Sequence, residues 1–209
     1  MWQNTGSEVL TPRILRVLDV AARAHDGHYR KGSDTPYVSH LFGVMHLAAA
    51  QGLADDIRED VLIACLLHDT LEDVPERYSA QQMEQDFGPH VLNIVRGVTK
   101  DDSLESWRER SDAYLAHLRG ASEASVIVSA YDKLHNLSSI LADHDAYGDK
   151  LWARFNSGRS DQQWWYGAVF FVVEQRCPQL PLLGEYRQKL ESCGLCSLEL
   201  SSGLNSVLS

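Results

Sequence analysis

Apolar residues recur every three or four positions through most of this chain, which is the spacing of amphipathic helices. The first such segment begins at Thr11, which can cap a helix, and Pro12, which suits the first helical position. One apolar face of this segment is made by Ile14, Leu15, Leu18, Ala21 and Ala22. The chain has no glycine-rich phosphate loop, no internal repeat and no alternation of strands with helices. The pattern therefore predicts an all-α protein.

Comparable patterns predict the remaining helices. Ser79 and Gln82 resemble a capping box, and Gly88 followed by Pro89 ends one helix and starts the next. The run 126–128 is β-branched, yet its lack of alternation and the helical pattern after it favour a helix. The expected helices cover residues 12–28, 37–52, 57–73, 80–87, 91–98, 106–119, 123–142, 160–176 and 181–192, the eighth capped by Ser160 or Asp161.

Composition indicates one folded body. Hydrophobic residues make up 44% of the 209 residues, enough for a sizeable core. We expect a single domain over residues 1–192 and a serine-rich, flexible tail over 193–209. The chain starts without the basic and apolar regions of a signal peptide, and the apolar run at 167–173 is too short to span a bilayer. These features predict a cytoplasmic protein with no membrane partner, and they make no prediction of the oligomeric state.

Charge narrows the class of ligand. Lys and Arg number 19 against 29 Asp and Glu, which gives a net charge of −10. Duplex nucleic acid requires clustered basic residues, so we expect no nucleic-acid partner. A small polyanion could bind only through a local basic pocket or a metal ion. Cys193 and Cys196 have the spacing of half a zinc site, but no second pair lies nearby, and we interpret them as incidental thiols.

The segment LLHDTLEDV, residues 66–74, places chemistry inside an apolar helix. His68, Asp69, Glu72 and Asp73 are spaced so that one helical patch presents an imidazole and three carboxylates. A solvated acidic stripe is the ordinary explanation for such a pattern. The preceding residues VLIACLL argue against it, because they indicate a buried helix and buried carboxylates need a counter-charge. The segment therefore favours a metal site.

Two further polar residues interrupt apolar helices elsewhere in the chain. His40 follows TPYVS, and Asp132 lies in VSAYDKLHNLSSI with a histidine and an asparagine one turn later. A lone residue of this kind is usually a hydrogen-bonded core residue. Three buried polar clusters on three helices instead suggest ligands that converge on one ion.

Four motifs carry a resemblance to a known family. AHDGHYRKGSDTPYVSH, LLHDTLEDV, FGPHVLNIVRGVTK and YDKLHNLSSI resemble, in order, the hydrolase domain of RelA/SpoT-type alarmone enzymes, which are HD-domain metal-dependent phosphohydrolases. The chain is too short for the synthetase and regulatory domains of the long members, so it looks like a free-standing small alarmone hydrolase. The resemblance covers about residues 18–176. His28, Gly32 and Lys133 depart from the residues common at their positions, and Gly32 bears on base recognition.

The resemblance implies an HD-domain helical bundle whose metal ligands are His40, His68, Asp69 and Asp132. The metal would be Mn²⁺, which suits two nitrogen and two carboxylate ligands with positions left open for water. Glu72 and Asp73 match the pair that orients or deprotonates the attacking water, Asn136 matches a residue that holds the nucleotide, and Arg30 with Lys31 match basic residues lying along it. The implied reaction removes the 3′-pyrophosphate of guanosine tetra- and pentaphosphate, (p)ppGpp, to give GDP or GTP and pyrophosphate.

The diphosphate needs basic partners in so acidic a protein. Arg30, Lys31 and Lys100 are the first candidates, with Arg154 and Arg159 as further ones. By the resemblance, Trp152 lines the pocket and Tyr166 hydrogen-bonds a phosphate. Three alternatives stay open: an HD phosphohydrolase of adenosine alarmones, one acting on the 2′-phosphate of NADPH, and an HD module that binds a nucleotide without turnover.

Overall fold

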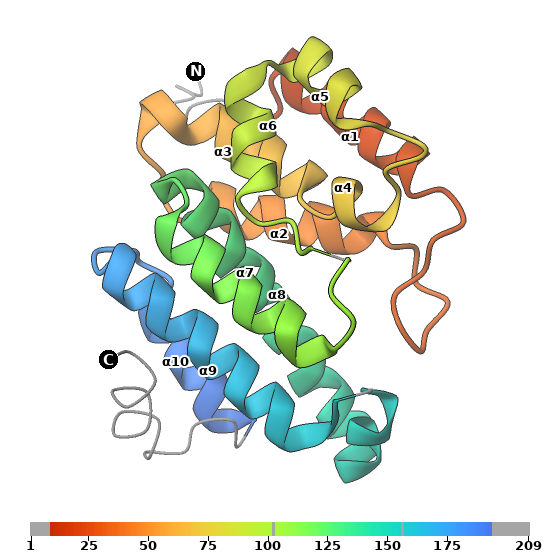
Figure 1. The fold of residues 1–209 in the computed structure, drawn as a ribbon, viewed down its shortest axis with the longest axis vertical. Coiled ribbons are helices and arrows are strands. Elements are labelled where there is room, and N and C mark those ends of the chain that lie inside the picture. The colour runs from red at the N-terminus through yellow and green to blue at the C-terminus, as the bar shows by residue number, and fades with distance from the viewer. Residues whose placement is uncertain (1–8, 102, 156, 194–209) are drawn as a thin grey trace, which may run out of the picture. The chain divides into compact units, whose positions relative to one another are not determined.

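A computed structural model describes residues 9–101, 103–155 and 157–193 of the chain, and over this part it is almost entirely helical (Figure 1). The contacts divide the chain into two compact units, Met1–Arg96 and Gly97–Ser209. The predicted all-α fold class is confirmed. Neither unit's described residues include a helix that is both long and apolar enough to cross a lipid bilayer.

The first unit is organised around α3, which packs against α1, α2 and α6. The bounds of its helices are α1 Pro12–Ala24, α2 Val38–Ala50, α3 Asp55–Leu67, α4 Thr70–Asp73, α5 Ala80–Phe87 and α6 Pro89–Arg96. From Val61 to Leu67 every residue of α3 is buried, which fits the uninterrupted apolar run there. The polar residues that follow Leu67 therefore begin at the end of the most buried helix of this unit.

The second unit is organised around the long helix α8, which packs against η1, α9 and α10. Its elements are α7 Trp107–Gly120, α8 Glu123–Tyr147, the 3₁₀ helix η1 Gly148–Arg154, α9 Gly158–Arg176 and α10 Leu183–Ser192. The β-branched run 126–128 is helical and buried, as the pattern favoured. Further along the same helix the buried residues are Tyr131, Leu134 and Leu137, so Asp132 lies in an apolar setting.

Capping residues explain most of the boundaries. Thr11 caps α1, and capping boxes start α5 at Ser79 and α7 at Ser106, where each serine side chain accepts from the third backbone N–H of its helix. The predicted cap of α9, Ser160 or Asp161, was wrong by three to four residues. This helix begins at Gly158 after Ser157, whose side chain makes no capping hydrogen bond. A prediction based on a capping side chain therefore places the start of the helix too late in the chain.

The expected continuous helix over 57–73 is divided. α3 ends at Leu67 and α4 begins at Thr70, with His68 and Asp69 forming a turn between them. Backbone N–H groups of Glu72 and Asp73 still bond to the carbonyl of Asp69 at 3.2 and 2.8 Å. The chain thus stays compact through the break, while both His68 and Asp69 sit at the junction instead of inside one regular helix.

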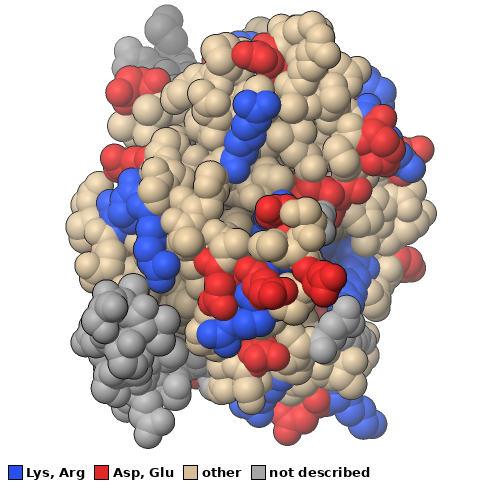
Figure 2. Space-filling view, viewed as in Figure 1, with Lys and Arg blue, Asp and Glu red and all other residues tan. Residues whose placement is uncertain are grey.

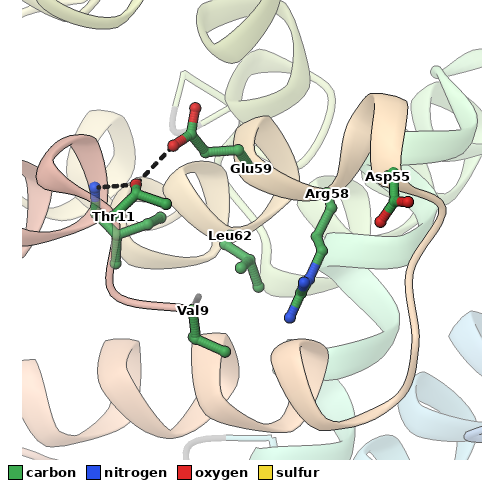
Figure 3. A pocket seen from close by; sticks show the side chains of 7 residues that line it. Val9, Thr11, Asp55, Arg58, Glu59 and Leu62 are labelled. Atoms are coloured by element: carbon green, nitrogen blue, oxygen red, sulfur yellow. Dashed lines mark hydrogen bonds between the residues drawn. The ribbon is translucent and has the colours of Figure 1, made fainter. Parts of the chain in front are cut away.

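A small hollow of about 170 Å³ opens where α1 meets α3 (Figure 3). In Figure 3 the Thr11 side chain points toward Glu59, and its hydroxyl donates to Glu59 Oε1 at 2.6 Å while accepting from the backbone of Ile14. Arg58 extends from α3 beside Leu62 into the hollow. One hydroxyl thus caps α1 and ties it to α3.

Charged side chains of both signs are interspersed on the face seen in Figure 2, with uncharged residues between them. No broad basic area covers that face of the described residues. This mixed distribution agrees with the acidic net charge of the chain.

Candidate metal centre and its surroundings

His40, His68 and Asp69 come together in the first unit. His40 lies on α2 and His68 at the end of α3, and both are buried, with 1% and 3% of their surface exposed. One possible ligand atom of each residue lies within 4.8 Å of those of the other two. The rings of His40 and His68 meet edge to face at 5.2 Å. Three of the four predicted metal ligands are therefore close enough to share one ion.

The hydrogen bond of His68 fixes which of its nitrogens is available. Nδ1 lies 2.9 Å from the carbonyl oxygen of Cys65. A carbonyl oxygen only accepts, so Nδ1 holds the hydrogen, and Nε2 of the neutral ring presents a lone pair. Nε2 lies 2.9 Å from Asp69 Oδ2, and His40 Nε2 lies 3.6 Å from the same oxygen. The His68 lone pair and the carboxylate repel each other unless a proton or a cation lies between them, so this donor set fits a divalent ion.

Tyr37 joins this centre to a second pair of histidines. Its hydroxyl donates to Asp69 Oδ2 at 2.6 Å, and its ring meets His40 edge to face at 5.5 Å. The same ring stacks on His28 at 4.1 Å and on His25 at 5.1 Å. Tyr37 therefore holds the Asp69 carboxylate in place while its ring orders the imidazoles around it.

The carboxylates of α4 lie next to the centre. Glu72 is half-buried, and Asp73 keeps an exposed surface. Partial loss of hydration, together with the negative charges of Asp69 and Glu72, raises the pKa of Asp73 to about 7, while the nearby Tyr37 hydroxyl acts in the opposite direction. Asp73 can therefore both hold and release a proton near neutral pH in the absence of an ion.

Asp132 belongs to the second unit and is treated with that unit alone. It is 5% exposed; Oδ1 accepts from Asn136 Nδ2 at 2.6 Å and Oδ2 accepts from Lys133 Nζ. Burial acts to lower the pKa of Lys133, but Asp132 and Tyr114 raise it well above its ordinary value, so the ammonium stays charged. As a carboxylate, Asp132 is chemically suited to bind a cation.

The predicted substrate contacts are divided between the units. Arg30 and Lys31 lie on the loop between α1 and α2, with the Arg30 guanidinium 5.8 Å from the centre of the Tyr37 ring. A backbone bridge between Tyr29 and Pro36 closes this loop. Gly32, which departs from the family pattern, has φ +74°, a conformation that residues with side chains rarely adopt. The structure thus gives Gly32 a backbone role in shaping the loop.

The remaining predicted contacts lie in the second unit. Lys100 Nζ stands 4.9 Å above the Trp165 ring, Trp152 and Tyr166 are buried, and Asn136 is half-buried beside Asp132. Arg154 ends η1, and its side chain lies outside the described part of the chain. Cys193 is buried and reduced, while Cys196 and the predicted tail beyond it also lie outside that part.

Sequence reasoning missed the part played by Tyr37 and His28, and it assigned His25 only a structural role near the metal ligands. Burial lowers the pKa of His25 to about 4, against the raising effect of Asp69, so its ring is neutral at physiological pH. The spacing of His25 and His28 at i and i+3 was visible in the sequence. The stacking of Tyr37 between these rings and the metal centre depends on how the loop folds back, for which the sequence has no local signal.

Comparison with known proteins agrees with this arrangement. A family model described as "HD domain" matches residues 17–159. The chain belongs to the HD-domain family. Two proteins named "Guanosine-3′,5′-bis(diphosphate) 3′-pyrophosphohydrolase MESH1" are similar to it. The one from Danio rerio is 34% identical over 131 residues, which cover 62% of this chain and 70% of the relative. The one from Homo sapiens is 35% identical over 136 residues, which cover 65% and 72%.

The solved structures include one described as "A metazoan ortholog of SpoT hydrolyzes ppGpp and plays a role in starvation responses". It superposes with a TM-score of 0.73 at 26% identity and covers 91% of this chain and 100% of that chain. The predicted membership among HD-type, metal-dependent hydrolases is therefore confirmed, as is the helical HD fold.

Proposed function

We propose that this HD-domain hydrolase removes the 3′-pyrophosphate of (p)ppGpp, with Mn²⁺ held by His40, His68, Asp69 and Asp132. The products are GDP or GTP and pyrophosphate. The named activity of the MESH1 relatives and of the matched solved structure supports this substrate. The order of the four sequence motifs supports the same assignment.

One observation supports the metal part of the proposal above the others. The Cys65 carbonyl commits His68 Nδ1 to a hydrogen, which leaves the Nε2 lone pair facing the Asp69 carboxylate at 2.9 Å. Two electron-rich atoms so close together are stabilised by a cation. Nitrogen and carboxylate oxygen ligands together suit Mn²⁺.

The residues divide the chemical work among them. When bound by these residues, a divalent ion would supply charge to polarise a phosphoryl oxygen and to lower the pKa of the attacking water. Asp73 accepts the proton of the attacking water, and Glu72 orients that water from one turn of α4. Tyr37 keeps Asp69 in position through its 2.6 Å hydrogen bond. Arg30 and Lys31 neutralise the leaving diphosphate, with Lys100, Asn136, Trp152, Arg154 and Tyr166 as further contacts to the nucleotide.

The proposal is tested by product analysis. Chelator-treated protein resupplied with Mn²⁺ is incubated separately with ppGpp, its adenosine analogue and NADPH, and the products are separated by anion-exchange chromatography. We expect pyrophosphate and GDP from ppGpp, at a higher kcat/KM than for either other substrate. Release of orthophosphate alone, or turnover of NADPH in preference to ppGpp, would contradict the proposal and favour the related phosphohydrolase activities.

Two variants separate metal binding from orientation of the attacking water. Asp69→Ala is expected to lose both retained Mn²⁺ and activity. Glu72→Gln keeps the shape of the side chain without its charge, so it should retain Mn²⁺ while kcat falls about 100-fold or more. His117→Gln, an exposed position on α7, is the matched control and should behave as the wild type. Wild-type rates in Asp69→Ala would rule this mechanism out.

A further inference from the structure

His25 and His28 form a second pair of imidazoles, beside the predicted metal centre and sharing no ligand with it. His25 is 3% exposed, His28 is half-buried, and their Nδ1 atoms lie 3.1 Å apart. Nε2 of His25 is buried and has no hydrogen-bond partner among the described residues. Among the described residues the polar contact of this ring is therefore the one between Nδ1 and the neighbouring imidazole, and an ion placed between the two Nδ1 atoms would replace that contact.

Asp73 completes a set of three possible ligands. One donor atom each from His25, His28 and Asp73 lies within 4.8 Å of the other two, in residues on the described part of the first unit. Two nitrogens bound to one tetrahedral zinc ion at about 2.0–2.1 Å lie roughly 3.3 Å apart. The observed 3.1 Å between the imidazole nitrogens is close to that separation. A modest turn of the half-buried His28 ring would aim both lone pairs at one ion.

The rings are held in place before any ion arrives. Tyr37 stacks on His28 with the two ring planes 6° apart and on His25 with the planes 15° apart. The loop that holds His28 is closed by backbone bonds from Arg30 to Thr35 and from Tyr37 to His28, at 2.9 and 2.8 Å. Side chains fixed in this way lose little conformational freedom on binding, which favours affinity.

We propose that His25, His28 and Asp73 bind a second divalent cation, for which Zn²⁺ is the best match. Two imidazoles and one carboxylate with an open fourth position are a ligand set that zinc favours. Zinc also binds nitrogen ligands more tightly than manganese does. The site therefore discriminates between the two ions by its ligands, since nitrogen donors outnumber the single carboxylate.

Occupation of this second site has a consequence that rests on the proposed function. A zinc ion on Asp73 occupies the carboxylate that takes the proton of the attacking water. Zn²⁺ is then an inhibitor of the Mn²⁺-loaded enzyme, through a site separate from the one that holds manganese. His28 determines this sensitivity without belonging to the hydrolytic machinery.

Zinc counting tests the site without any turnover. Untagged, chelator-stripped full-length protein is dialysed against low micromolar Zn²⁺, and bound zinc per chain is measured by mass spectrometry of the metal. We expect two ions in the wild type and one in His28→Gln or Asp73→Asn. His117→Gln and the double variant Cys193→Ser/Cys196→Ser should still bind two, because neither changes the site.

A wild-type count of one overturns the proposal, whether or not the variants fold. A count of two in His28→Gln also overturns it, because the second ion would then not depend on His28. A count of zero overturns it as well, because the two ions would then not occupy separate sites. In the activity assay, His28→Gln should need at least tenfold more Zn²⁺ for half-inhibition. Absence of alarmone hydrolysis would remove only this last comparison, and the zinc counts would still decide the site.

Discussion

His25 shows how one buried side chain couples the candidate centre to the stability of the fold. It is almost fully buried, and it lies close enough to Asp69 for that carboxylate to act on its pKa. Burial outweighs this attraction and lowers the pKa to about 4. In the unfolded chain the pKa of the same imidazole is about 6.5. The folded and unfolded states therefore bind different numbers of protons over the range between these values.

The sign of the resulting pH dependence follows directly. Below about pH 6.5, His25 binds a proton in the unfolded chain, whereas in the folded protein it binds one only near pH 4. Acidification therefore destabilises the folded state. We expect His25 to account for a loss of about 2 kcal/mol in the free energy of unfolding between pH 8 and pH 5. Urea unfolding of chelator-treated wild type and His25→Gln at both pH values measures the difference. Equal losses in the two proteins would contradict this, and His117→Gln serves as the control.

At the scale of single residues, the sequence predicts which side chains are candidate metal ligands better than it predicts which residues hydrogen-bond to them. His68 and Asp69 could be recognised because they end an apolar run, and His40 because it interrupts one. The hydrogen bond from Tyr37 to Asp69 spans 32 positions of the chain and requires the loop after α1 to fold back. Local patterns contain no information about such a contact, so the sequence shows Tyr37 only as part of a motif.

At the scale of elements, boundaries follow the side chains that cap them. Thr11, Ser79 and Ser106 were visible as caps, and α1, α5 and α7 begin where they indicate. The division between α3 and α4 had no such signal, because His68 and Asp69 keep nearly helical backbone angles and only the hydrogen-bond ladder is interrupted. The start of α9 was misjudged for the related reason that Ser157 begins the helix without a capping bond.

Thr11 offers a direct test of how α1 is fixed. Thr11→Val keeps the volume of the side chain and removes both hydrogen bonds of the hydroxyl, to the Ile14 backbone and to Glu59. We expect the free energy of unfolding to fall by about 1–2 kcal/mol. Thr11→Ser retains the hydroxyl and should lose less than half as much. Urea unfolding compares the three proteins, and equal stability of Thr11→Val and wild type would refute this role.

At the scale of the whole molecule, the proposed ligands are shared between the two compact units. His40, His68 and Asp69 belong to the first and Asp132 to the second. The sequence pattern does not predict this division, because it indicates a single domain over residues 1–192. The single domain stays a prediction. If the proposed function is correct, Mn²⁺ binding links the stabilities of both units.

This linkage can be measured. We expect Mn²⁺ at 100 times its Kd to raise the free energy of unfolding of the wild type by about 2.7 kcal/mol. Asp132→Asn should weaken Mn²⁺ binding at least about tenfold, because a charged ligand is replaced by a neutral one. Asp145→Asn changes an exposed residue of the same helix and is the matched control. Calorimetric titration gives both affinities, and an unchanged Kd in Asp132→Asn would remove Asp132 from the ligand set.

The buried pair of Asp132 and Lys133 bears on how the protein matures. Because the Lys133 ammonium already neutralises the Asp132 carboxylate inside α8, the second unit does not need a metal ion to assemble. Under the proposed function, the second unit is therefore folded before the ion binds, and removing the ion by chelation abolishes activity without unfolding that unit.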